Sequence, residues 1–257
     1  MINELSNAET NAALLSRYKK RTTRPLSVYT NYFFIVMALL FVIFAVGGFV
    51  PDYQLMHAQH ISVYWFAHLH GGIMTSWLLV YLIQALLARK GNFKLHRKLG
   101  LFSVGLGVLV WISMGILIYH DNIGYPVHAA IPWANVFLLG MFMNLFAIFF
   151  TWGIIARKNA ASHKRFLYLA TMIVISAGYN RILFNAGVDP TLRWIAHPSL
   201  SGFPNPSAIL LYNDLLLIPL FMYDFFAFRS VHKITMMGTI LIITIQLALV
   251  LVWRFLP

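Results

Sequence analysis

The chain has 257 residues, of which 60% are hydrophobic and 10% charged, and it contains no cysteine. A soluble domain carries about 25% charged residues, so a water-soluble globular enzyme is excluded. The lack of cysteine excludes disulfides, thiolate metal sites, cysteine-held iron–sulfur clusters and covalently attached c-type haem. Seven acidic residues are present, and only Asp214 and Asp224 fall within predicted membrane spans. This argues against a carboxylate-bridged di-metal centre.

Seven apolar stretches are long enough to cross a bilayer, which takes about 20 helical residues. They lie near 31–50, 61–88, 100–120, 131–156, 166–188, 208–228 and 234–254. These stretches predict an all-α, polytopic membrane protein with seven transmembrane helices. We expect a polar, basic N-terminal tail over 1–28, without a cleavable signal peptide, and a single seven-helix domain over 29–257.

The positions of lysine and arginine predict the orientation in the membrane. Sixteen of the 19 basic residues lie in the tail or in the loops after the second, fourth and sixth spans. Positive loops stay in the cytosol, so the N-terminus is predicted to be cytoplasmic and the C-terminus outside, in the bacterial inner membrane. The net charge of +12 then suits anionic lipid headgroups at these loops. Nucleic acid is not expected as a partner, because the charge is spread over short loops.

The three basic loops resemble one another in sequence. They read ALLARKGNFKLHRKLG, GIIARKNAASHKRFL and FFAFRSVHKITMMG, and each contains a histidine followed by a basic residue. These histidines, His96, His163 and His232, are separated by 67 and 69 residues. The period fits three tandem helical hairpins after an extra first helix. Chance similarity is the alternative, because short basic turns are common at cytosolic helix ends.

One face of the second predicted span is rich in polar and aromatic side chains. At the 3.6-residue period this face contains His70, Met74, Trp77, Tyr81 and Gln84. His68 lies about 200° around the helix from His70, so a regular helix does not let both bind one ion. Hydrogen bonding between helices is the simpler interpretation of these two histidines.

Ionisable residues inside a membrane are costly and are functional candidates. Counted along the helices, they form two layers. The outer layer is a predicted ligand pocket of His68, His70, Arg181, Asn213 and Asp214, and the inner layer comprises Gln84 and Asp224 above His96, His163 and His232.

Arg181 and Asp214 both lie about 10 Å below the outer boundary, so we predict that they pair. Pro219 is expected to bend the sixth span. The inner histidines either cap helices by bonding headgroups or loop carbonyls, or jointly bind a metal ion or haem.

The chain resembles a group of uncharacterised bacterial multi-pass membrane proteins, known as families of domains of unknown function. The resemblance covers roughly residues 60–240 and is carried by His68, His70, Trp77, Gln84, the string LHRKLG, the string SHKR, Asp224 and His232. These families are broadly similar to cytochrome b561-type helical bundles, in which histidines on facing helices ligate haem b. Such sites need two histidines at matched depth, and this chain has only His68 and His70 near mid-span.

The favoured hypothesis is a redox or metal-binding membrane protein, because ten histidines accompany so few acids. Its cofactor would be haem b or a transition-metal ion, held by His70, His96, His163 and His232, with the last three as metal ligands. The alternatives are a transporter or receptor whose Arg181 binds a carboxylate or phosphate in an outward-facing pocket, and a non-catalytic accessory subunit of a larger membrane complex. A hydrolase with a metal-bound water is a further alternative, and enzymatic activity stays open.

Overall fold

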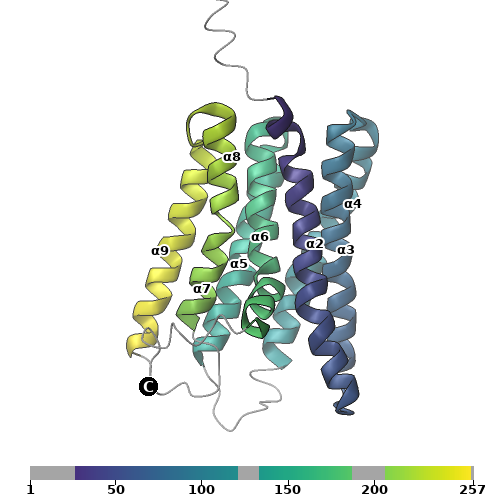
Figure 1. The fold of residues 1–257 in the computed structure, drawn as a ribbon, viewed down its shortest axis with the longest axis vertical. Coiled ribbons are helices and arrows are strands. Elements are labelled where there is room, and N and C mark those ends of the chain that lie inside the picture. Colours follow the sequence, from purple (N-terminus) through teal and green to yellow (C-terminus); the bar gives the residue numbers. More distant parts are fainter. Residues whose placement is uncertain (1–26, 121–132, 187–205, 256–257) are drawn as a thin grey trace, which may run out of the picture.

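The computed structural model describes residues 27–120, 133–186 and 206–255, which form an upright bundle of helices (Figure 1). In chain order these are α2 (Ser27–Ala58), α3 (Trp65–Arg89), α4 (Phe93–Tyr119), α5 (Trp133–Ile155), the short 3₁₀ helix η2 (Ala156–Lys158), α6 (Ala160–Asn185), α7 (Pro206–Leu215), α8 (Ile218–Phe228) and α9 (Lys233–Phe255). Most of the predicted tail over 1–28 lies outside the described residues.

Six helices, α2 to α6 and α9, are long and apolar enough to cross a membrane. Large apolar side chains are exposed on their outer faces, among them Ile43, Leu101 and Ile240, which are 57%, 78% and 59% exposed. Such an exterior suits acyl chains rather than water. The prediction of an all-helical, multi-pass membrane protein is therefore confirmed. The sixth predicted span differs, because it is divided into α7 and α8.

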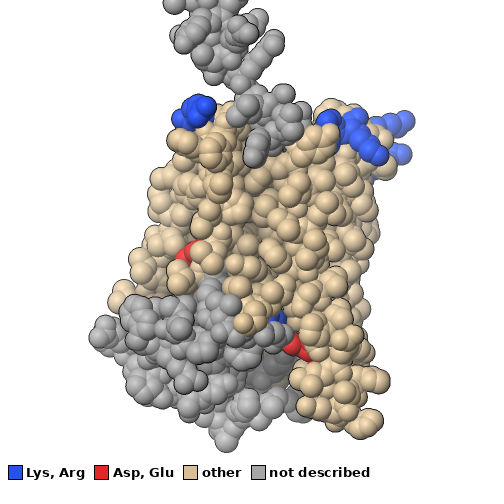
Figure 2. Space-filling model, viewed as in Figure 1, with Lys and Arg blue, Asp and Glu red and all other residues tan. Residues whose placement is uncertain are grey.

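Basic side chains gather at one end of the bundle. The turns between α3 and α4, α5 and α6, and α8 and α9 lie there, and Figure 2 shows lysine and arginine at this end above a broad flank with few charged side chains. We call it the basic end, and the predicted orientation would place it in the cytosol. The N- and C-terminal orientation stays a prediction.

Two helix boundaries differ from the predicted ones in ways that matter for the site. The helix α2 continues past Pro51 to Ala58, so Asp52 is helical rather than part of an outer loop. Proline removes one backbone donor, and here the helix continues beyond it. At the basic end α6 begins at Ala160, six residues earlier than predicted, so Arg165 lies inside the helix.

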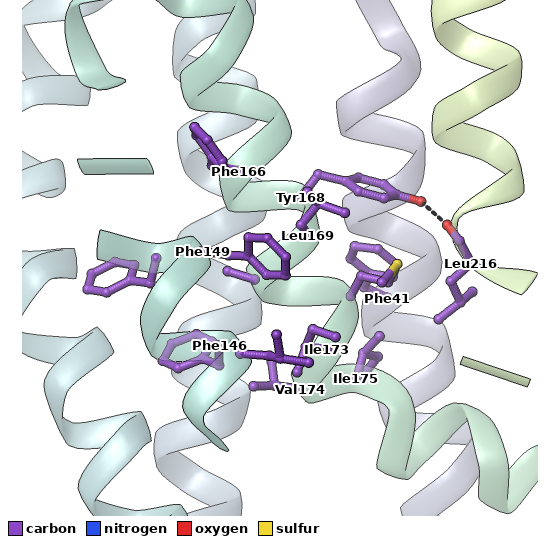
Figure 3. Packing of buried hydrophobic residues seen from close by; sticks show 14 of the residues in the cluster. Phe41, Phe146, Phe149, Phe166, Tyr168, Leu169, Ile173, Val174, Ile175 and Leu216 are labelled. Atoms are coloured by element: carbon purple, nitrogen blue, oxygen red, sulfur yellow. Dashed lines mark hydrogen bonds between the residues drawn. The ribbon is translucent and has the colours of Figure 1, made fainter. Parts of the chain in front are cut away.

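The helix α6 is the centre of the bundle. Every residue from Tyr168 to Ser176 is buried, and a helix buried on all sides must be covered by neighbours. It packs against α2, α5, α7 and α9. Figure 3 shows Phe41 of α2 and Phe149 of α5 converging on Tyr168 and Leu169 of this helix. The central position of α6 brings its polar residues against the broken helix.

The break between α7 and α8 falls at Leu216 and Leu217. Pro219 has no amide hydrogen, and the Leu220 amide donates to the Leu217 carbonyl instead of the Leu216 carbonyl. The Tyr168 hydroxyl donates to this freed Leu216 carbonyl at 2.7 Å (Figure 3). Interrupted helices persist at membrane depth only where neighbours satisfy the freed backbone groups, as Tyr168 does here. The predicted bend is thus a full interruption.

Candidate functional site

The polar face predicted for α3 packs inward. Trp77 and Tyr81 are buried, and the His70 Nδ1 atom lies 3.0 Å from the Ser113 hydroxyl of α4. His68 contacts a different partner, the ring of Tyr53, at 5.8 Å between ring centroids. The two histidines therefore act on separate neighbours, as their spacing predicts, and His70 bonds between helices.

Two of the inner histidines lie close together at the basic end. Their ring centroids are 6.4 Å apart, and each Nδ1 contacts a backbone carbonyl: His96 that of Gln84 at 3.3 Å, and His163 that of Gly153 at 2.7 Å. A carbonyl only accepts, so each Nδ1 is the donor in its contact. Each histidine thus joins the two helices of its hairpin by a hydrogen bond.

His232 plays a different part from the other two. It precedes α9, and its Nδ1 accepts the Ile234 amide at 3.1 Å, as an N-terminal cap does. Burial, and then the positive charge of Arg165, lower the pKa of the His232 ring below its usual value, so the ring is neutral at pH 7. The structure does not group His232 with the other two inner histidines. Among the described residues, no three histidine, aspartate or glutamate side chains could hold a metal ion.

The hairpin repeat is visible in two of the three turns. Asn92 caps α4 by accepting the Leu95 amide, and Asn159 caps α6 by accepting the Ser162 amide. In both turns the histidine follows four residues after the capping asparagine. The third turn has no asparagine, so His232 itself is the cap. Local structure thus agrees with a repeat in the first two hairpins and departs from it in the third.

A fully buried ion pair joins α6 to α8 at the basic end. Arg165 and Asp224 both have side chains that are 0% exposed. The guanidinium donates to Asp224 Oδ1 from Nε, at 3.0 Å, and from Nη2, while Nη1 donates to the Ala161 carbonyl at 2.7 Å. Asp224 Oδ2 accepts from the His232 amide at 3.0 Å and from the Thr235 hydroxyl of α9. Every polar edge of the pair is therefore bonded.

Sequence reasoning missed Arg165, because the predicted loop included it. The signal was Asp224: an intramembrane carboxylate needs a cation, and a basic residue near the start of a neighbouring helix can supply one. Lys164 beside it donates to the Tyr223 hydroxyl at 2.8 Å, with Nζ 4.9 Å from the centre of the Phe34 ring. Lys164 and Arg165 thus point into the bundle rather than toward headgroups. Gln84 of the predicted inner layer is separate from this pair and donates to the His96 carbonyl at 3.1 Å.

The predicted pair of Arg181 with Asp214 is wrong. Arg181 Nε donates to Asp52 Oδ2 at 2.8 Å, and the two side chains are 43% and 34% exposed. The guanidinium also lies 4.5 Å from the centre of the Phe49 ring. The counting placed Asp52 outside the membrane because the first span was ended before Pro51. The longer α2 brings Asp52 to Arg181. The Arg181 guanidinium is therefore paired with Asp52 and does not contact Asp214 in the predicted pocket.

The other two predicted pocket residues lie together on α7, beside the break. Asn213 is 0% exposed, and neither its amide nitrogen nor its amide oxygen has a hydrogen-bond partner in the described structure. The next residue, Asp214, accepts the Gln246 amide of α9 at 3.0 Å. An unsatisfied buried amide and a carboxylate therefore follow one another at the end of α7, directly before the interruption.

Known proteins give no independent assignment for this arrangement. The resemblance to uncharacterised membrane families and to cytochrome b561-type bundles stays a prediction. No protein-family model, no curated protein and no solved structure matches the chain.

Proposed function

We propose that the protein is a membrane transporter that binds a small polar solute at the break between α7 and α8. The observation that carries the proposal is Asn213, a fully buried amide with both polar atoms unbonded among the described residues. Leaving such a group without a partner costs about 1–3 kcal/mol. A carboxamide offers one donor group and one acceptor, so the matching solute presents both an acceptor and a donor.

The backbone at this place supports the proposal. Discontinuous helices near the middle of a membrane are the usual binding elements of secondary transporters, because their ends direct unpaired backbone groups at the solute. Here the break separates Asp214 from Asp224, with Leu216 between them. At the break, the Tyr168 hydroxyl donates a hydrogen bond to the Leu216 carbonyl. Movement of α7 against α8 would exchange this bond for one to the solute.

A line of polar side chains on α9 extends the candidate route across the bundle. Thr235, Thr239 and Gln246 recur at helical spacing on one face of the helix. Thr235 contacts Asp224 at the basic end, and Gln246 contacts Asp214 toward the opposite end. Between them the buried Thr239 hydroxyl has no bonding partner in the described structure. Polar positions therefore continue from one side of the break to the other.

A thermal-unfolding screen of the purified protein tests this proposal. We expect at least one class among amino acids, small carboxylates, sugars and nucleosides to raise the melting temperature at millimolar concentration, because a ligand at 100 times its Kd adds about 2.7 kcal/mol. Asn213→Leu should abolish the rise. The matched control is Asn144→Leu, which changes an exposed asparagine whose side chain donates to the Gly140 carbonyl of its own helix. An equal rise in Asn213→Leu would contradict a site at Asn213.

The closeness of His96 and His163 favours a second candidate function, redox or metal binding at the basic end. A metal-ligating histidine commonly donates its other ring nitrogen to a carbonyl, as both of these rings do. These residues fit a metal site only in part. The two rings supply two ligands, and His232 Nδ1 is already bonded to the Ile234 amide as a helix cap.

Metal analysis and the absorption spectrum of the protein, purified without a histidine tag, test this second candidate. A bound metal or haem should be lost in His96→Ala and in His163→Ala, and retained in His232→Ala. Bound metal that survives both of the first two changes would place the site elsewhere.

A further inference from the structure

The three acidic side chains that the structure describes differ in their partners. Asp224 is paired with Arg165, and Asp52 is paired with Arg181. Asp214 has a neutral partner instead, the Gln246 amide at 3.0 Å. Arg165 and Arg181, the two arginines of α6, are therefore already paired with other carboxylates. Asp214 is left beside the break without a cation among the described residues.

The position of Asp214 makes a negative charge costly there. It is half-buried at the second-last position of α7, and the C-terminal end of a helix carries a partial negative charge. A charged side chain at membrane depth is costly when nothing pairs with it. One hydrogen bond from a neutral amide contributes less than this cost and does not offset it. The carboxylate therefore needs a proton or a bound cation.

The neighbouring groups favour the proton. The Gln246 group that faces Asp214 Oδ1 is its NH₂, a donor, and a donor does not ligate a metal cation. Among helices packed against α7, α6 brings the titratable side chains Tyr168, Tyr179 and Arg181, with Arg181 held by Asp52. The sequence of α5 contains no titratable residue, and Lys233 of α9 lies at the basic end. The side chain of Arg254 lies outside the described residues.

We propose that Asp214 is the proton-binding residue that couples transport to the proton gradient. This inference rests on the proposed function, because Asp214 follows directly after the solute-binding Asn213 in α7. Protonation would remove the charge that Gln246 now partly compensates and would let α7 move within the bundle. Release of the proton would restore the bond between Gln246 and the carboxylate. Solute binding and proton binding would thus act on the same half-helix.

Infrared difference spectroscopy of the full-length protein in lipid tests this inference directly. A protonated carboxylic acid has a C=O stretching band that a carboxylate lacks. We expect this band in the wild type, with an amplitude that falls as the pH is raised. The band should be lost in Asp214→Asn, which mimics the protonated side chain and is expected to fold. The matched control is Asp52→Asn, which should retain it, because Asp52 already has Arg181 as its partner.

Each outcome decides the inference. A wild-type spectrum in which Asp214→Asn removes no band would show that Asp214 is ionised and would overturn it. A band that is lost in Asp214→Asn but does not change with pH would also overturn it, because a fixed proton couples nothing. The result is separable from the proposed function. Ligand-dependent stabilisation that requires Asn213, with no titrating band, would leave transport standing without proton coupling. A titrating band with no stabilising ligand would support proton binding at Asp214 and contradict the solute site at Asn213.

Discussion

Replacing Arg165 with methionine should lower the free energy of unfolding by about 3–5 kcal/mol, the largest single-residue effect we expect in this protein. The change leaves Asp224 fully buried, with its Oδ1 atom deprived of both guanidinium bonds. Asp224→Leu should cost a similar amount, because the guanidinium then keeps only the bond to the Ala161 carbonyl. The double variant Arg165→Met with Asp224→Leu should be more stable than either single variant, since no buried charge remains.

Reversible unfolding in mixed micelles of the wild type, both single variants and the double variant gives the coupling free energy from a double-mutant cycle. Arg157→Met serves as control. Arg157 lies near the same turn, is exposed and contacts only the Ile154 carbonyl, so its replacement should change stability by no more than about 0.5 kcal/mol. Additive effects of Arg165→Met and Asp224→Leu would mean that the two groups are not coupled.

Gly178→Ala should destabilise the bundle by at least the ~1–3 kcal/mol typical of overpacking. At this position α6 meets α2 backbone to backbone, and a Cβ on Gly178 would lie 2.8 Å from the Phe44 carbonyl oxygen and 3.1 Å from the Ala45 Cα. Across the contact, a Cβ on Gly48 would meet the Gly178 carbonyl. Backbone atoms do not move aside as a flexible side chain does, so the two helices must separate. The separation would also strain the pair of Arg181 with Asp52.

The matched control is Gly105→Ala in α4, where an added Cβ would meet nothing within 4 Å. Alanine favours a helix over glycine by about 1 kcal/mol, so this variant should be as stable as the wild type or more stable. Melting temperatures of the two variants in the same detergent give the comparison. Equal melting temperatures would show that the α2–α6 contact tolerates a side chain.

The failure of the Arg181 and Asp214 prediction shows what counting along a helix can and cannot do. Depth follows from 1.5 Å per residue, and a similar predicted depth was the only basis for this pair. Pairing also needs the two side chains to face each other, which depends on how each helix is rotated and which helices are neighbours. Asp214 faces α9, whereas Arg181 faces the extended end of α2. Nothing local in the sequence records these choices.

Other parts of the site were accessible from the sequence because they depend on a single helix. The spacing of His68 and His70 was enough to separate them, and the inward face of α3 followed from a 3.6-residue period. Arg165 was not accessible, because its burial depends on where α6 begins and on α8 and α9 packing over it. A basic residue near a helix start ordinarily lies in water or among headgroups. An arginine at position 165 was therefore expected to be exposed.

By itself, the sequence determined the all-helical, membrane-spanning architecture, the clustering of basic residues at one end and a bend at Pro219, which in the structure is an interruption. These features depend on hydropathy, charge and backbone chemistry, which each stretch of chain carries independently of its neighbours. Only the tertiary structure decided which carboxylates have arginines and which one does not. It paired Asp224 with Arg165 and Asp52 with Arg181, and left Asp214 with Gln246. The reason is geometric: an ion pair forms only where two helices place both groups within bonding distance, and packing sets that distance.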